Sequence, residues 1–587
     1  MNKWDLSKLY ENDEAFEKDL YEIKSLIATL SSFKGKLGDE EELCKYLRFS
    51  KEANRILEKA YSFASMRSDL NKKDVKNNEA VTRCRLIVND LISATSFESP
   101  EILALGKEKM DAFFAKHEDL KEFEFGYEKL FHANEHVLDA NSERLLSYFG
   151  PISNEGSELY SMLAVGDYVP TTVTLQDGKK ITVTQGNWRS EIEKASTAED
   201  RRIIFEAIFN YYAEHKNTFG QIYNTVLESE LADMKSRNYS SILESHLFNN
   251  NIPTSVYKTL VEVTSSHTEP LKKYYELRRK YFKLDKHRSY DRFLQMSSSS
   301  KEYTYEEAKE LFFKSIAKFD DDFVMKAHEV LKEGYVDVYE TEGKRSGAYS
   351  SGGNGIHPFI LLNYDNSLDS VFTVAHEAGH SIHTLYSTEN QPLMLQGYTI
   401  FVAEIASTFN EHNLLDYFIE SGEASKEEKI LLLQKAIDEI VATYYRQTLF
   451  AQYELELSEL AEKGQPINYQ VCSNKMKELY TKYYGIDIEE EKVKEFVWAY
   501  IPHLFYTPFY VYQYATSFAA SLKIYENVKK EGKVAFERYK GLLKAGGSKY
   551  PTVEAKEAGV DFEDPNTFLA VTNRLEALVN ELEELIK

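Results

Sequence analysis

Apolar residues recur along most of the chain at alternating spacings of three and four, which is the period of an amphipathic α-helix. A stretch between Ser425 and Gly464 begins with a capping box, Ser425 with Glu428, and ends before Pro466. We expect this long stretch to be bent or broken within its length. With only 12 prolines in 587 residues, the pattern predicts a mainly helical protein. A shorter amphipathic stretch near the amino end has an apolar face made by Phe16, Leu20, Ile23, Ile27 and Leu30.

Short regions with the period of a β-strand interrupt the helices. Residues 172–184 alternate β-branched residues around Asp177-Gly178, a pair typical of a tight turn, and predict a β-hairpin. Residues 335–339 and 357–364 predict two further strands of a small sheet, separated by glycine-rich sequence. We therefore divide the chain near residue 190, into an N-terminal helical lobe (1–190) that ends in the hairpin and a longer helical lobe (191–587) that contains the small sheet.

Composition excludes several classes of protein. Lys and Arg total 71 against 95 Asp and Glu, so the formal net charge of −24 argues against a nucleic-acid partner. Residues 272–283 interleave basic and aromatic residues, but on a helix they form an apolar seam with a solvated basic face. Three widely separated cysteines without a CxxC pair, no signal peptide and no membrane-spanning apolar run predict a soluble, cytoplasmic protein.

The chemistry is concentrated in His376-Glu377-Ala378-Gly379-His380, an HExxH motif within a helical run. Histidines four residues apart lie on one helix face, so both imidazoles can bind one Zn²⁺, and Glu377 beside them can accept a proton from its bound water. With 14 histidines in the chain, roughly 0.03 such motifs are expected by chance. Asn366 is the expected N-cap of the helix. Gly379 is unfavourable in a helix interior, which predicts a close approach of another segment there.

A catalytic zinc needs a third protein ligand. His383 and Tyr386 occupy the positions where proteases of the HExxHxxGxxH type carry glycine and histidine, so that type is excluded. Glu404 lies in an apolar run where a carboxylate needs a strong partner, and we expect it to be the ligand rather than Glu389 or Glu411. Glu411, two helical turns later, is the candidate acceptor for a ligand histidine N–H. His383 is expected to support the site or contact substrate.

Residues 373–383 together with 403–411 resemble the zinc segments of oligoendopeptidase F, in the thimet-oligopeptidase family. The resemblance extends over nearly the whole chain and includes residues 4–10, 343–349 and 503–515. It implies a mostly helical, two-lobed bowl with a deep substrate channel and one zinc ion per chain. It also implies His376, His380 and Glu404 as metal ligands and Glu377 as general base.

A tyrosine-rich segment follows at residues 498–514. His503, Tyr506, Tyr510 and Tyr514 would lie near one face if this segment were helical, while Tyr512 would point elsewhere. The same spacing is also typical of an aromatic core stripe, and Pro508 interrupts it. The resemblance implies a histidine and tyrosines that contact substrate and the tetrahedral intermediate, and we rank Tyr510 and Tyr514 above Tyr506 and Tyr512.

The sequence therefore predicts a zinc-dependent endopeptidase that hydrolyses internal bonds of short unfolded peptides. A helical zinc carboxypeptidase is the alternative within enzymes, and it would need a cation that binds the substrate C-terminus. A catalytically silent peptide-binding scaffold is the alternative outside enzymes, although Glu377 is present. Residues 350–355 are expected to form a loop over the site or an ordinary turn, and peptide could pair with an edge of the 357–364 strand. The oligomeric state is not predicted.

Overall fold

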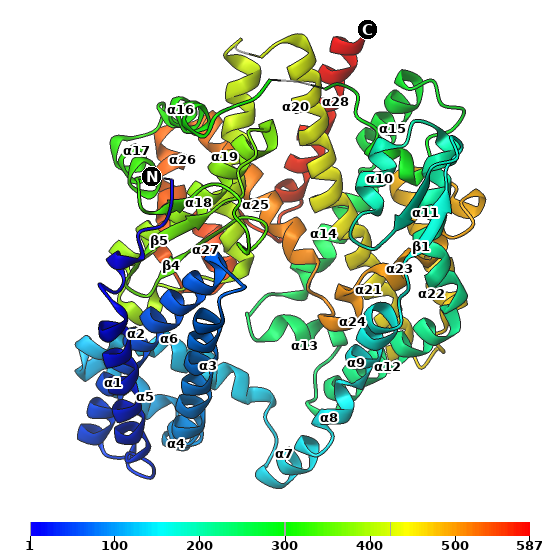
Figure 1. The fold of residues 1–587 in the computed structure, drawn as a ribbon. Helices are drawn as coiled ribbons and strands as arrows, with labels where there is room; N and C mark the ends of the chain where they lie inside the picture. The colour runs from blue at the N-terminus through cyan, green and yellow to red at the C-terminus, as the bar shows by residue number, and fades with distance from the viewer. Residues whose placement is uncertain (1, 299–300, 423) are drawn as a thin grey trace. The chain divides into compact units, whose positions relative to one another are not determined.

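The computed structural model describes residues 2–298, 301–422 and 424–587, which are mostly helical, with two small sheets (Figure 1). The predicted fold class, mainly α, is confirmed. Contacts divide the chain into two compact units. Unit 1 comprises Met1–Glu135, Ser300–Glu420 and Ala520–Asp561; unit 2 comprises His136–Ser299, Ser421–Ala519 and Phe562–Lys587. The division near residue 190 stays a prediction.

Unit 1 contains the helices that carry the HExxH motif and Glu404. Its helices are α1 (Asp13–Ser31), α2 (Glu40–Leu70), α3 (Val75–Thr95), α4 (Glu98–Leu105), α5 (Lys107–Lys116), α6 (Glu124–Ala133), α16 (Tyr305–Ile316), α17 (Asp321–Val330), α18 (Leu368–Asn390), α19 (Ile400–Glu420), α26 (Lys533–Ala545) and α27 (Pro551–Glu557). The predicted apolar face of α1 is buried at Phe16, Leu20, Ile23 and Leu30 and partly buried at Ile27. Helix α18 packs against α19, α26 and the sheet of this unit.

Unit 2 contains the tyrosine-rich segment. Its helices are α7 (Ala140–Ser147), α8 (Gly150–Ser153), α9 (Glu155–Ser161), α10 (Trp188–Lys194), α11 (Ala198–Glu214), α12 (Lys216–Ser236), α13 (Ile242–Phe248), α14 (Thr254–Ser266), α15 (Glu269–Tyr281), α20 (Lys426–Glu439), α21 (Arg446–Glu462), α22 (Tyr469–Tyr484), α23 (Val497–Tyr500), α24 (His503–Tyr506) and α28 (Pro565–Ile586). Helix α25 (Tyr512–Glu531) begins in unit 2 and ends in unit 1. The basic and aromatic residues 272–283 lie mainly on α15, whose apolar seam is buried as predicted.

Two segments of unit 2 are π-helical. The long stretch from Ser425 has the predicted capping box and is interrupted by a π-helix, Ile440–Tyr445, between α20 and α21. A second π-helix, Met162–Gly166, directly follows α9. Such segments are rare and frequently occur at functional sites.

The sheets agree with the predicted strands but add one. The hairpin forms from β1 (Thr171–Thr174) and β2 (Lys180–Val183), with Thr171 opposite Val183. The three-stranded sheet has the order β3 (Val336–Asp337), β5 (Ile356–Leu361), β4 (Tyr349–Gly353), with β5 parallel to β3 and antiparallel to β4.

The glycine-rich residues were predicted to form a loop or turn, and this is wrong for Ser350–Gly353, which lie in β4. A Cβ at Gly352 would lie 2.6 Å from the Cα of Pro358, so glycine is required where β4 lies beside β5, its antiparallel neighbour. The prediction that peptide could pair with an edge of residues 357–364 is also wrong, because β5 is the central strand; β4 is an edge strand instead.

Among the described helices, none combines the length and apolar character that crossing a membrane requires.

Candidate metal centre

Helix α18 begins one residue later than the sequence suggested. Ser367 is the N-cap, and its hydroxyl accepts a hydrogen bond from the Ser370 N–H at 3.1 Å. Asn366, the predicted cap, precedes it in a left-handed conformation with φ of 64°. An asparagine tolerates this conformation better than most residues, which explains its place in the turn before the helix.

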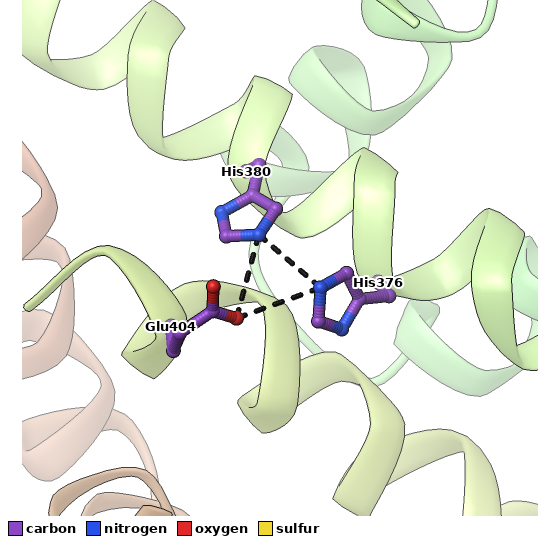
Figure 2. Close-up of side chains that lie close together, drawn as sticks. All are labelled: His376, His380 and Glu404. Carbon is purple, nitrogen blue, oxygen red and sulfur yellow. Dashed lines mark hydrogen bonds and ion pairs between the residues drawn. The ribbon is translucent and has the colours of Figure 1, made fainter. Parts of the chain in front are cut away.

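The helical spacing brings the two histidines of the motif onto one face of α18, as predicted. Their Nε2 atoms lie 3.2 Å apart. Glu404, in the second turn of α19, places one carboxylate oxygen 3.5 Å from each of these nitrogens. Figure 2 shows the three side chains, His376, His380 and Glu404, converging from the two helices.

This group fits a tetrahedral metal ion. Zinc bonds of about 2.0–2.1 Å to nitrogen and oxygen imply ligand atoms about 3.3–3.4 Å apart, close to the spacing of the three donor atoms here. His376 donates its other ring N–H, at Nδ1, to a carboxylate oxygen of Glu411. That hydrogen bond leaves the Nε2 lone pair directed at the group, which is the usual arrangement of a metal-binding histidine. Glu411 thus occupies the supporting position that the sequence suggested.

The electrostatics of the group favour a cation. Burial lowers the pKa of His376, but the hydrogen bond with Glu411 and the nearby carboxylates outweigh burial and raise that pKa to about 9. Burial raises the pKa of Glu404, but the adjacent His380 and His376 lower it to about 2. Three carboxylates, Glu377, Glu404 and Glu411, therefore surround two imidazoles, and a divalent cation balances that excess of negative charge.

Glu377 is placed to act as a base beside the group. Its side chain is buried, and its Oε2 atom has no hydrogen-bond partner within the described residues. Burial raises the pKa of Glu377, and the neighbouring histidines offset that rise only in part. A buried carboxylate without a partner is costly, so this oxygen is suited to a transient partner such as a reacting water molecule.

Gly379 allows α18 and α19 to approach closely. A Cβ at this position would lie 2.6 Å from the carbonyl oxygen of Ala406 and 2.8 Å from the Cα of Ser407. Both atoms belong to the backbone of α19, so a larger residue would have to move the helix. The prediction of a close approach at Gly379 is confirmed, and this contact sets the distance between the histidines and Glu404.

We expect Gly379→Ala to lower the free energy of unfolding by about 1–3 kcal/mol and to weaken metal binding, because the helix carrying Glu404 must shift. Urea unfolding and metal titration measure the two effects. Gly541→Ala is the matched control: Gly541 is also helical, in α26, and a Cβ there meets nothing within 4 Å. This control should be stabilised by up to about 1 kcal/mol, as expected for alanine in a helix. Equal behaviour of both variants would contradict the packing argument.

The remaining acidic and histidine candidates on α18 have other contacts. Glu389 is an exposed residue that forms an ion pair with Lys326. His383 is fully buried and stacks on the Tyr398 ring, with centroids 3.7 Å apart and an angle of 8° between the planes. Burial lowers the pKa of His383 to about 3, so it is a neutral packing residue that supports α18.

Sequence analysis missed one polar contact of Glu404. The hydroxyl of Ser407 donates a hydrogen bond to the Glu404 carboxylate at 2.8 Å, and so fixes its orientation. The signal was present, because a serine three residues after a glutamate lies on the same face of a helix.

In unit 2 the tyrosine-rich segment is not one continuous helix. Helix α24 ends at Tyr506, the chain turns through Pro508 and Phe509, and α25 begins at Tyr512. Phe509 takes a left-handed conformation with φ of 57°, which ends any continuous helical face. The condition for one shared helical face, a continuous helix, is therefore not met.

The turn nevertheless gathers three of the predicted residues. The ring centroids of His503 and Tyr510 lie 6.0 Å apart, those of His503 and Tyr514 6.1 Å, and those of Tyr510 and Tyr514 5.5 Å. Tyr506 packs against Tyr160 instead and is 42% exposed. Tyr512 points elsewhere, into the core against Tyr257. The preference for Tyr510 and Tyr514 as catalytic groups stays a prediction.

Glu454 of α21 holds this turn in place. Its Oε1 accepts a hydrogen bond from the Phe509 N–H at 2.8 Å, and the carboxyl is buried in the core. Burial raises the pKa of Glu454 to about 8. Between the ordinary pKa of 4.5 and about 8, the folded state therefore binds a proton that the unfolded state has lost.

Stability is consequently expected to fall as the pH rises from about 4.5 to 8, by a few kcal/mol, since one pKa unit corresponds to about 1.4 kcal/mol. Glu454→Gln keeps an acceptor for Phe509 but cannot ionise. Urea unfolding at several pH values should show that the variant gains stability relative to the wild type across this range. Parallel curves for the two proteins would refute the raised pKa.

Comparison with known proteins identifies the family. Residues 192–573 match the model described as Peptidase family M3, and residues 101–169 match the model described as Oligopeptidase F. Oligopeptidase PepF of Bacillus subtilis is 34% identical over 585 residues, covering 99% of this chain and 87% of the relative. Group B oligopeptidase PepB of Streptococcus agalactiae is 32% identical, covering 100% of this chain and 97% of the relative.

Solved structures agree with the sequence relatives. A protein from Chlamydophila abortus has a TM-score of 0.91 at 30% identity and covers 100% of this chain and 98% of its own. Oligoendopeptidase-F from Enterococcus faecium has a TM-score of 0.74 at 28% identity, covering 98% of this chain and 99% of its own. The resemblance inferred from the motifs is confirmed. The chain therefore belongs to peptidase family M3 and is a metallo-oligopeptidase, an enzyme that hydrolyses peptides.

Proposed function

We propose that this enzyme is a cytoplasmic, zinc-dependent endopeptidase that hydrolyses internal bonds of short unfolded peptides, with one zinc ion per chain. The observation that carries the proposal is the convergence of two imidazole nitrogens and one carboxylate oxygen at 3.2–3.5 Å. Glu377 lies on the helix of the two histidines, and its Oε2 atom has no hydrogen-bond partner among the described residues. Two histidines and a glutamate are a donor set typical of catalytic zinc, which keeps one position open for water or substrate.

Each residue has a defined role in this proposal. His376, His380 and Glu404 hold the ion, Glu411 orients His376 and Ser407 orients Glu404. A bound zinc ion supplies a Lewis acid that polarises the scissile carbonyl and lowers the pKa of water. Glu377 accepts the proton of the attacking water and delivers it to the leaving amine. Because a carboxylate performs both transfers, no second acid is required.

The peptide backbone needs its own partner, and β4 is suited to that role. It is an edge strand, and it contacts the zinc-binding helix through the Ser350 and Ser381 hydroxyls, which lie 2.8 Å apart. A substrate that adds to this edge by main-chain hydrogen bonds would be held with little dependence on its side chains. The sequence suggested β5 as the strand that pairs with peptide, and we propose β4 in its place.

We further propose that His503, Tyr510 and Tyr514 contact the substrate, with the two hydroxyls donating to the oxygen that becomes negative in the transition state. Tyr510→Phe or Tyr514→Phe should then lower kcat by about 10²–10³-fold and leave KM and metal content nearly unchanged. Steady-state kinetics with metal analysis measure this. Wild-type kcat in both variants would show that the tyrosines only pack, and His503 would be the next candidate donor.

The reaction class is tested with a peptide of about ten residues, blocked at both ends, whose fragments are weighed by mass spectrometry. Internal cuts are expected. Terminal trimming would favour the carboxypeptidase, and no cleavage would favour a silent peptide-binding scaffold.

Substrate size is tested by placing the same sequence within a stable folded protein. The free peptide should be cleaved and the embedded one spared, because an extended peptide must reach the ion and the strand edge together. Comparable rates for the two would contradict specificity for unfolded peptides.

A further inference from the structure

Unit 2 contains a cavity of about 630 Å³ to which no role has been assigned so far. Its wall includes His503 and Tyr506 from α24, Arg446 from α21 and Arg189 from α10. Two arginines and no aspartate or glutamate line it within the described residues. In a chain with a formal net charge of −24, a cavity with only positive charges in its wall is unexpected unless an anion enters it.

Arg446 is the central observation. Its Nε atom is buried and has no hydrogen-bond partner within the described residues. Its guanidinium lies over the ring of Phe450, with 5.3 Å from its central carbon to the ring centroid. Arg446 is half-buried, with its guanidinium at the cavity wall. A partly desolvated guanidinium without a carboxylate is costly, so a protein retains one where a ligand supplies the missing acceptor.

The surroundings of Arg446 increase that cost. Burial lowers its pKa to about 10, and the nearby Arg292 and Arg189 contribute to the lowering, offset in part by Tyr480 and Tyr484. The fold holds these like charges close together, so they repel one another. Their joint field favours a ligand with negative charge.

Of the two π-helices in the described chain, one contributes residues to the wall of this cavity and the other ends directly before a residue of that wall. Met162–Gly166 contributes Ala164 and Val165 to its wall, and Ile440–Tyr445 ends directly before Arg446. A π-turn adds a residue to a helix and so rotates the side chains that follow it. Because such turns frequently occur at functional sites, their position beside residues of this wall supports a binding site.

The wall also offers hydrogen-bond donors. The Tyr500 hydroxyl already accepts a hydrogen bond from the Trp188 Nε1–H at 3.2 Å, so its own proton can be donated to a ligand. Tyr506 carries a further hydroxyl at the cavity wall. A planar guanidinium with hydroxyl donors matches the two oxygens of a carboxylate.

We propose that this cavity binds a carboxylate of the peptide substrate through Arg446, with Arg189 adding to the attraction. The naming of a peptide as the source of the carboxylate rests on the proposed function, whereas the site's preference for an anion does not. The carboxylate belongs either to the C-terminus of the peptide or to an acidic side chain, and both present the same two oxygens to the guanidinium.

The test measures binding without turnover. Fluorescently labelled peptides are titrated into zinc-loaded Glu377→Gln protein and followed by anisotropy. One pair differs only in a free or amidated C-terminus, and a second, C-terminally amidated pair differs only in an internal glutamate or glutamine. We expect the carboxylate-bearing member of at least one pair to bind about 10–100-fold more tightly, and the pair that shows the difference identifies the source.

Arg446→Met in the same background should abolish that difference, and Arg446→Lys should restore part of it by keeping the charge without the planar fork. Arg85→Gln is the matched control, because Arg85 is an exposed arginine of α3 in unit 1. This control should leave the preference for the carboxylate intact.

Thermal unfolding of the ligand-free proteins tests whether a loss of carboxylate preference comes from misfolding. Arg446→Met should melt at or above the wild-type temperature, because it removes a partly buried charge whose Nε atom has no partner among the described residues. The inference would be overturned if a folded Arg446→Met protein kept the full carboxylate preference, or if the Glu377→Gln protein showed no preference. It would also be overturned if inorganic phosphate bound in place of the carboxylate peptides. Carboxylate-dependent binding by a wild-type enzyme that cuts no peptide would instead overturn the proposed function alone.

Discussion

Glu377→Gln is expected to retain one metal ion per chain while kcat falls by about 10³–10⁴-fold. Glutamine has the shape of glutamate, so the buried position on α18 stays filled and the three proposed ligand side chains keep their places. Its amide cannot accept the proton of an attacking water, so the loss is expected in the chemical step. KM should change little, because the lost interaction belongs to the transition state.

Elemental analysis and steady-state kinetics on the same preparation measure both parts of this prediction. Glu389→Gln is the control, because Glu389 lies on the same helix but is exposed and ion-paired with Lys326. It should keep both metal and activity. A metal-free Glu377→Gln protein would make Glu377 a ligand, and a fully active one would show that the base lies elsewhere.

Glu404→Ala is expected to lose the metal. The Glu404 oxygen lies 3.5 Å from both histidine nitrogens, and its removal leaves two ligands where a catalytic zinc has three. Loss of an outer partner of a metal site commonly weakens binding by about 10–100-fold, so loss of a ligand should weaken it by more than 100-fold. Activity should fall with metal content.

Metal titration against a competing chelator gives the affinities. Glu411→Gln provides the comparison, because Glu411 contacts His376 and is not one of the three converging donors. It should lose affinity by about 10–100-fold, less than Glu404→Ala. A fully occupied Glu404→Ala protein, or a larger loss in Glu411→Gln, would reverse the two assignments.

The sequence predicted those features that depend on local spacing. Two histidines four residues apart must share a helix face, and a glycine amid apolar helix residues indicates a close neighbour; both follow from helix geometry alone. Glu404 was recognised because a carboxylate in an apolar run needs a partner. The role of Glu411 followed from its position two turns further on the same helix.

The features that sequence analysis missed depend on contacts between distant segments. Ser350–Gly353 resembled a loop because glycine is unfavourable in strands, but Gly352 is required by the backbone of Pro358 on the neighbouring strand. The turn at Phe509 depends on the buried Glu454, 55 residues earlier in the chain. Arg446 lies within the predicted long helical stretch, and only the folded structure shows that its Nε atom is buried without a hydrogen-bond partner among the described residues.

We propose that His376, His380 and Glu404 together hold the catalytic metal. An anomalous difference map, recorded at the zinc absorption edge from a crystal of protein purified without chelators, tests it most directly. We expect one strong peak per chain, about 2.0–2.2 Å from the Nε2 atoms of both histidines and from a Glu404 carboxylate oxygen. A peak bound by other residues, or no peak from protein that is fully active, would contradict it.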